Sequence, residues 1–469
     1  MATKRGKQGL IGLLIAAALL AGAYLIWGSG EENPDQRPTG TVEDLRTLRE
    51  RDDINVLFVL IDTLRADRLR SYGYDRETSP ALDYLALTGI RFAENRAQSS
   101  WTKSSMASLW TGLYPTRTDV VQHVDALADE AKMPAELFAD AGYVTAGIWR
   151  NGWVAPNFGF SQGFEIYQTP IAQQAPADMR QEARAGRIDG TDIDVIFSAM
   201  EFIRAHRDQR WFLYIHMMDV HQYISTENTA IFGNSYSDSY DNSILWTDSQ
   251  LGELLMALYR MDLAKKTVVV VASDHGEAFG EHGTEGHARD LYPEVVLTPF
   301  IISLPFKLNP PAVVYSRTQN IDIWPTVLDM LGVSGPPDVD GISRLPLLLD
   351  EERDLGPEAL RARDLGFAQL DRNWGKLEEP PSTIVAVREG NLRLIHDTDD
   401  QAQDQLFDIV ADSGELRNLA ESHSNDLERL RERAKNYLES GTPWEGGAPE
   451  VEIDEMHLRQ LRALGYSIE

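Results

Sequence analysis

Short, continuous apolar runs constrain the fold of this chain more than any other feature. The clearest are Asn55–Asp62 (NVLFVLID), Trp211–Met217 (WFLYIHM) and Thr267–Ser273 (TVVVVAS), and Val144–Ile148 and Pro299–Leu304 have the same character. An unbroken apolar run of this length is typical of a strand buried on both faces, as in a parallel sheet covered by helices.

Segments with helical periodicity lie between these runs: Ser79–Thr88, Ser104–Thr111, Met133–Ala141, Asp194–Ala205, Ser243–Tyr259 and Ile321–Leu331. Alternating strands and helices predict an α/β fold with a mostly parallel sheet and helices on both faces. We expect residues 54–345 to form this domain. In residues 346–469, two short strand patterns precede a helix that starts near Asn425, which predicts a small C-terminal α+β lobe.

Residues 1–28 predict a membrane anchor. Three basic residues precede the apolar run Gly9–Trp27, and nineteen helical residues reach about 28 Å, roughly the thickness of the hydrocarbon core. The basic flank predicts that the remainder is exported to the periplasmic or extracellular side. The alternative is a signal peptide cleaved after Ala21-Gly22-Ala23, which would release a secreted protein. Residues 29–53 are polar and contain two prolines, so we expect a linker.

Charge and cysteine content exclude two classes of partner and ligand. The formal net charge of −29 argues against nucleic-acid binding, which needs a basic face, and is typical of a soluble acidic surface. The chain has no cysteine, so disulfides and thiolate metal ligands are excluded. The oligomeric state stays open.

Polar residues at the ends of the predicted strands point to a metal site. Asp62 ends the first strand, and Asp274-His275 follow the valine-rich one. Because the carboxyl ends of parallel strands meet at one crevice, these side chains are expected to converge. Two carboxylates and an imidazole suit Zn²⁺ or Mn²⁺, and Ca²⁺ is a further candidate.

Thr102 precedes a helical segment and is the candidate nucleophile. A hydroxyl at a helix N-terminus lies at the positive end of the helix dipole, where anions bind, and a metal ion lowers its pKa. The alternative for Thr102, as for Asp62, is a helix cap. Five of the ten histidines also cluster after two of the strands: His216, His221, His275, His282 and His287.

Taken together, these segments resemble the sulfatase family of the alkaline phosphatase superfamily. The similar segments include NVLFVLIDTLRADRLRSYGY, SSWTKSSMASLWTGLYPTR, WFLYIHMMDVH, SDHGEAFGEHGTEGH and IDIWPTVLDMLG, in family order. The resemblance covers nearly the whole exported part and implies an alkaline-phosphatase-like fold. By position it implies metal ligands at Asp62, Asp274 and His275, the nucleophile at Thr102, leaving-group contacts at His221 and His287, and an ester-oxygen contact at Asn151.

The segment around Thr102 departs from the family pattern. Sulfatases have Cys or Ser there, oxidised to formylglycine, so the resemblance implies that no formylglycine forms in this chain. The family's Pro and Arg after the nucleophile are Ser104 and Met106, its second Asp is Thr63, and its Gly-Lys-Trp-His segment is Gly147–Arg150, without the lysine. Threonine nucleophiles occur in related phosphodiesterases, phosphoethanolamine transferases and lipoteichoic acid synthases, which act on phosphoesters.

We therefore expect a membrane-anchored, metal-dependent hydrolase or transferase that attacks phosphate esters through Thr102. The Thr102 hydroxyl would be a fourth metal ligand, Lys103 and the nearby helix amides would bind substrate, and His221 or His287 would protonate the leaving group.

Three alternatives stay open. Asp219 with His221 or His282 could hold a second metal ion. The substrate could be a sulfate ester, attacked directly by the threonine. The protein could also be an inactive, membrane-tethered binding protein that keeps the fold, since the family's Arg, Lys and second Asp are missing.

Overall fold

The computed structural model describes residues 34–172, 175–181, 190–349, 364–453, 458 and 461–462. The predicted anchor at residues 1–28 lies outside this part of the chain. Within the described residues, no helix is long and apolar enough to cross a membrane.

An eight-stranded sheet forms the centre of the molecule, and all five apolar runs contribute a strand to it. The strand order is β16-β3-β14-β10-β2-β8-β5-β6. The five strands from β10 to β6 are parallel, whereas β14 runs antiparallel to both of its neighbours. The strands are β2 (Asn55–Ile61), β3 (Ile90–Phe92), β5 (Val144–Ile148), β6 (Ile166–Gln168), β8 (Trp211–Met217), β10 (Thr267–Ala272), β14 (Phe300–Ser303) and β16 (Ala312–Val314).

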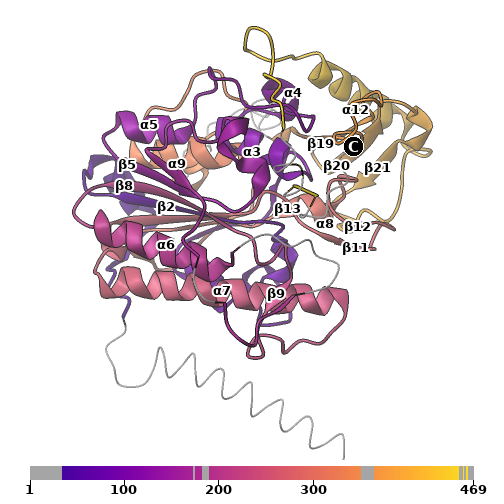
Figure 1. Cartoon of the computed structure of the whole chain (residues 1–469). Helices are drawn as coiled ribbons and strands as arrows, with labels where there is room; N and C mark the ends of the chain where they lie inside the picture. Colours follow the sequence, from indigo (N-terminus) through magenta and orange to yellow (C-terminus); the bar gives the residue numbers. More distant parts are fainter. Residues whose placement is uncertain are drawn as a thin grey trace, which may run out of the picture.

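Helices cover both faces of this sheet, as predicted (Figure 1). One face carries α3 (Thr102–Thr111), α5 (Pro134–Asp140) and α9 (Ile323–Leu331), and the other carries α2 (Pro80–Thr88), α6 (Asp192–Ala205) and α7 (Tyr236–Arg260).

Strand β2 shows why its sequence is apolar from Val56 to Ile61. Because side chains alternate along a strand, Phe58 packs into the core with Trp110 and Trp324 of α3 and α9, while Val59 packs into the core that contains α6 and α7. All seven residues of β2 are buried.

The C-terminal lobe is a separate antiparallel sheet, β18-β19-β20-β21, with one helix against it. Its elements are β18 (Gly366–Asp371), β19 (Thr383–Glu389), β20 (Leu392–Asp397), β21 (Gln405–Asp408) and α12 (Ser424–Leu438). Leu430, Ala434 and Tyr437 of α12 bury the outer face of this sheet against Val385 and Leu394. The lobe lies beside the edge of the catalytic domain that carries α8 (Pro293–Val296) and β13 (Leu297–Thr298), and confirms the predicted α+β subdomain (Figure 1).

The linker expected over residues 29–53 is wrong for its described part, residues 34–53. Leu45 and Leu48, three positions apart in a 3-10 helix (Val42–Glu50), are fully buried. Arg37 and Asp35 form a buried ion pair at 2.7 Å, and the Arg37 guanidinium donates to the hydroxyl of Ser303. The segment therefore packs on the domain of the eight-stranded sheet: its two leucines share one buried face, Asp35 and Arg37 pair with each other, and Arg49 pairs with Asp329 of α9.

Candidate active site

Strand register brings the predicted metal ligands together. Leu60 of β2 lies between Ala272 of β10 and His216 of β8. Asp62 and Asp274 each follow this row by two residues, so they project from neighbouring strand ends at the same level. Gly276 then permits the turn after Asp274, because a Cβ at this position would lie 2.2 Å from the Glu294 carbonyl oxygen.

Asp62, Asp274 and His275 form a buried group that could hold a metal ion. One ligand atom from each lies within 4.8 Å of the other two. Asp62 Oδ1 and Asp274 Oδ2 are buried without a hydrogen-bond partner in the described structure, which is costly for a carboxylate unless a cation compensates it. The His275 Nδ1–H donates to the Gly276 carbonyl at 3.0 Å, which leaves Nε2 with its lone pair toward the group. This donor set fits a divalent metal ion.

Two buried carboxylates this close together have opposite pKa shifts. Burial raises the pKa of Asp62, but the hydrogen bond from His216 and the nearby imidazoles hold it well below its usual range. Burial and the charge of Asp62 raise the pKa of Asp274, and His275 only partly opposes this shift.

Thr102 joins this group as the first residue of α3. Its hydroxyl lies 3.1 Å from His275 Nε2. The Asn151 side-chain amide donates to Asp62 Oδ2 at 2.8 Å and lies 3.5 Å from Thr102 Oγ1. The predicted nucleophile, ligand group and ester-oxygen residue therefore occupy one site.

His216 also belongs to the site, although the sequence analysis assigned it no role. Its Nε2–H donates to Asp62 Oδ2 at 2.9 Å, and its Nδ1 accepts from the Tyr214 hydroxyl at 2.7 Å. Tyr214 and His216 are two apart in β8 and therefore project on the same face. This spacing, just before the strand end, was the available signal.

His221 and His287 border the ligand group. The His287 ring centroid lies 4.5 Å from that of His275 and 5.1 Å from that of His221. The His287 Nδ1–H donates to Glu277 Oε2 at 3.1 Å. Burial lowers the pKa of His287, but the Glu277 carboxylate outweighs this effect and raises it above the usual value. Burial lowers the pKa of His221 to about 4.

Lys103, predicted to bind substrate, is directed elsewhere. Its buried ammonium donates to the backbone carbonyls of His123 and Asp125 and lies 3.9 Å from the centroid of the Phe158 ring. Successive residues of a helix point about 100° apart, which is consistent with Thr102 and Lys103 having different neighbours. Lys103 holds the loop before α5 in place.

The predicted second metal site is not assembled. Asp219 Oδ1 pairs with Arg150 at 2.6 Å, and its Oδ2 accepts from the Trp246 indole N–H. His282 pairs with Glu294 at 2.7 Å and stacks on Tyr292. Across the described ranges, Asp62, Asp274 and His275 are the only group of three or more such residues that could hold an ion.

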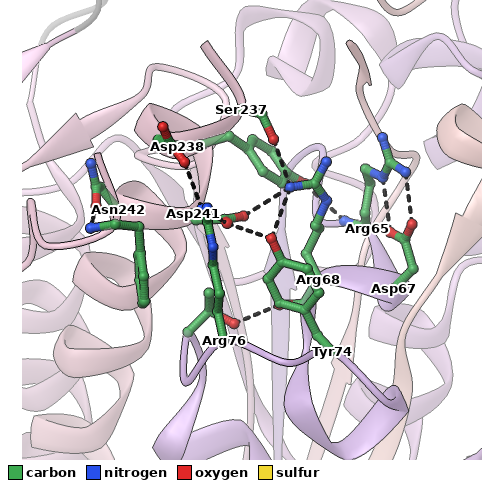
Figure 2. Close-up of polar contacts among 12 residues, drawn as sticks. Arg65, Asp67, Arg68, Tyr74, Arg76, Ser237, Asp238, Asp241 and Asn242 are labelled. Atoms are coloured by element: carbon green, nitrogen blue, oxygen red, sulfur yellow. Dashed lines mark hydrogen bonds and ion pairs between the residues drawn. The ribbon is translucent and has the colours of Figure 1, made fainter. Parts of the chain in front are cut away.

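The loop that follows Asp62 is anchored to helix α7, as Figure 2 shows. Buried Asp241 accepts from Arg76 at 2.7 Å, from Tyr74 at 2.5 Å and from Arg68 at 3.1 Å.

Thr63, the first residue of this loop, departs from the family pattern and adopts φ +61°, a strained value for a β-branched residue. Its hydroxyl donates to the carbonyl of Asp62 at 2.7 Å, and its N–H donates to Asp274 Oδ1 at 3.2 Å. Thr63 therefore contacts the ligand group through its backbone.

Comparisons with known proteins identify the family of this chain. Residues 54–333 match the Sulfatase family model, and residues 280–440 match a model described as N-sulphoglucosamine sulphohydrolase, C-terminal. Arylsulfatase K of Mus musculus is 23% identical, covering 80% of this chain and 78% of the relative, and choline-sulfatase of Rhizobium meliloti is 24% identical, covering 78% and 82%. The phosphonate monoester hydrolase of Agrobacterium radiobacter shares the fold, with a TM-score of 0.66 at 19% identity over 85% of this chain and 100% of that one. This chain belongs to the sulfatase family.

Proposed function

We propose that this protein is a metal-dependent hydrolase or transferase that acts on phosphate or phosphonate esters with Thr102 as its nucleophile. The observation that carries the proposal is the Thr102 hydroxyl, 3.1 Å from His275 Nε2 and beside two carboxylates with uncompensated oxygens. A threonine cannot become formylglycine, so the hydroxyl itself has to make the bond to the reacting atom.

The three candidate metal ligands indicate what chemistry a bound metal ion would supply. A divalent cation held by Asp62, Asp274 and His275 would polarise an ester oxygen and lower the pKa of the Thr102 hydroxyl. The N-terminus of α3 favours negative charge at the same point. The Asn151 amide, 2.8 Å from Asp62 and 3.5 Å from Thr102, orients both groups and can donate to an ester oxygen.

The two histidines supply proton transfer. The Thr102 hydroxyl gives its proton, directly or through water, to neutral His221 as Oγ1 forms a bond to phosphorus. The bond to the leaving oxygen breaks, and protonated His287 gives its proton to that oxygen. Its ion pair with Glu277 favours the protonated imidazole this role needs. Water, or an acceptor alcohol, then attacks phosphorus and the bond to Thr102 Oγ1 breaks. In this second half His287, now neutral, takes the proton of the attacking group, and His221 returns its proton to Thr102 Oγ1.

Sulfate esters are the second candidate substrate. The family match and the printed names of the relatives, arylsulfatase K and choline-sulfatase, favour them. Direct attack by Thr102 on sulfur would use the same groups in the same order.

Turnover of four chromogenic substrates tests the proposal. The full chain with Mn²⁺ or Zn²⁺ is given 4-nitrophenyl phosphate, its phenylphosphonate analogue, bis(4-nitrophenyl) phosphate and 4-nitrophenyl sulfate. We expect hydrolysis of at least one phosphorus ester, and Thr102→Ala should lower it about 1000-fold or more. Thr111→Ala, at the far end of the same helix, should keep it. Hydrolysis of the sulfate alone would select the second candidate, and bound metal without turnover of any ester would indicate a binding protein.

We also propose that the protein is tethered at the membrane with its catalytic domain exported. The apolar run Gly9–Trp27 with its basic flank supports this placement. Protease added outside intact cells or spheroplasts should cut the catalytic domain from a membrane-bound N-terminal fragment, and full protection would oppose the proposal.

A further inference from the structure

A buried cluster of arginines lies between the catalytic domain and the C-terminal lobe. Arg96 comes from β4 (Asn95–Arg96) of the catalytic domain, and Arg388 and Arg393 come from β19 and β20 of the lobe. All three are at most 8% exposed. They line one cavity of about 20 Å³ together with apolar residues and Gln319.

The register of the lobe sheet makes this cluster a row of like charges. Arg388 is directly opposite Arg393 on the antiparallel pair β19-β20, and Gly366 of β18 is directly opposite Arg388 on the other side. Like charges at directly opposite positions of antiparallel strands are destabilising. The absence of a side chain at Gly366 helps to leave the space, because a Cβ there would lie 3.1 Å from Arg388 Nη2 and 2.8 Å from Gln319 Oε1.

Carboxylates compensate part of this charge. Glu415 pairs with Arg393 and lies 3.7 Å from Arg96 Nη1. Glu94 pairs with Arg96 and with Arg317 at 3.1 Å. With Asp364, 3.5 Å from Arg317, three carboxylates pair with the four guanidiniums, which outnumber them by one. Glu294 also acts on Arg393, but it pairs with His282.

Arg388 carries that excess. None of its three guanidinium nitrogens has a hydrogen-bond partner in the described part of the chain, and its nearest carboxylates, Glu94 and Asp364, lie 4.0 Å away. Burial and the neighbouring Arg96 lower the pKa of Arg388 to about 10. A buried guanidinium that makes no hydrogen bond, and has carboxylates only at 4.0 Å, is incompletely compensated, which favours a further acceptor in the cavity.

We propose that this cavity is a halide site, occupied by chloride, that joins the C-terminal lobe to the catalytic domain. A cavity of about 20 Å³ has room for one water-sized particle. Among the residues that the structure describes, guanidiniums and no carboxylate line it. A water molecule would accept hydrogen bonds but leave the charge uncompensated, whereas a monatomic anion accepts from several N–H groups and cancels the charge.

Bromide tests the site because it replaces chloride and scatters anomalously. Crystals of the full chain grown without chloride and soaked in sodium bromide should show an anomalous peak among Arg96, Arg388 and Arg393. The thermal midpoint Tm should rise by about 2 °C or more, with saturation, when bromide replaces gluconate at constant ionic strength.

Variants separate this site from general salt effects. Arg388→Met should abolish the bromide-dependent rise in Tm, and Gly366→Ala, which fills the cavity without removing a charge, should reduce it. Arg433→Gln, an exposed arginine of the same lobe, should leave it unchanged. If Arg388→Met does not fold, the anomalous peak in the wild-type crystal and the bromide-dependent rise in Tm of Gly366→Ala still test the proposal. No anomalous peak in the cavity, or the same bromide response in wild type and Gly366→Ala, would overturn the proposal.

Discussion

Replacing His216 by phenylalanine tests whether the group behind the metal ligands sets metal affinity. Phenylalanine keeps the ring volume in β8 but removes the N–H that donates to Asp62 Oδ2 at 2.9 Å. A hydrogen bond to a charged group contributes about 1.5–3 kcal/mol. Because Asn151 still donates to the same oxygen at 2.8 Å, we take the lower part of this range, about 1.5–2 kcal/mol.

This free energy corresponds to a Kd for Mn²⁺ or Zn²⁺ that is raised about 10- to 30-fold, in line with the effect of lost outer contacts at metal sites. Tyr214→Phe removes the hydroxyl that orients His216 but keeps the bond to Asp62, so we expect a smaller increase, about 3-fold. The assay is calorimetric titration of the metal-free full chain, with turnover measured at saturating metal.

His206→Gln, on a half-buried histidine that caps the C-terminal end of α6, is the control and should bind metal like wild type. At saturating metal, His216→Phe should recover turnover to within about 5-fold, because His216 orients a ligand and does not touch the substrate. An unchanged Kd for His216→Phe would refute this reasoning, as would lost turnover at saturating metal with an unchanged Kd.

Three further predictions concern other buried groups. Asp274→Ala should lose bound metal and turnover together, and metal analysis showing wild-type content would contradict its role as a ligand. Lys103→Met should lower Tm, because two buried carbonyls lose their hydrogen-bond donor at about 1–3 kcal/mol each. It should keep kcat within about 5-fold of wild type. A loss of kcat at an unchanged Tm would instead indicate that Lys103 binds substrate. Burial raises the pKa of Asp248 to about 7. The folded protein therefore favours the neutral carboxyl of Asp248. The stability that Asp248 contributes is fully present below the pKa of an unfolded aspartate, about 3.9, and is lost as the pH rises through 7. Tm should therefore fall more steeply between pH 5 and 8 in wild type than in Asp248→Asn, and parallel profiles would refute this.

Local sequence was sufficient to predict the catalytic sheet. Strands such as β2 and β10 are buried on both faces, so every position after the first is apolar and the run stands out from its surroundings. The polar residues that follow them fall at one edge of the sheet because parallel strands end in register. This is why Asp62, Asp274 and His275 could be grouped without coordinates.

Partners that lie far apart in sequence could not be predicted. Asp219 has the position of a ligand at a strand end, but Arg150, 69 residues earlier, occupies its carboxylate. Glu294 removes His282 from the site in the same way. Residues 34–53 resemble a linker because charged residues are frequent there. Only the tertiary structure shows that Arg37 also donates to Ser303, 266 residues later, and is buried with its ion-pair partner Asp35.

The direction of side chains within one helix turn was predictable and was misjudged. Thr102 and Lys103 are neighbours in sequence, yet the helix turns them toward different surroundings, so only one can face the metal ligands. His216 was missed because it lies inside the apolar strand β8, whereas the predicted site residues were those that follow the strand ends.

The most direct test of the account is the identity of the residue that becomes covalently modified during turnover. The full chain is mixed with a phosphorus ester that it hydrolyses, quenched in acid within the first turnover, digested and analysed by mass spectrometry. The account predicts a phosphoryl group on Thr102, absent from Thr102→Ala. Modification of another residue, or rapid turnover with no covalent intermediate at any quench time, would contradict it.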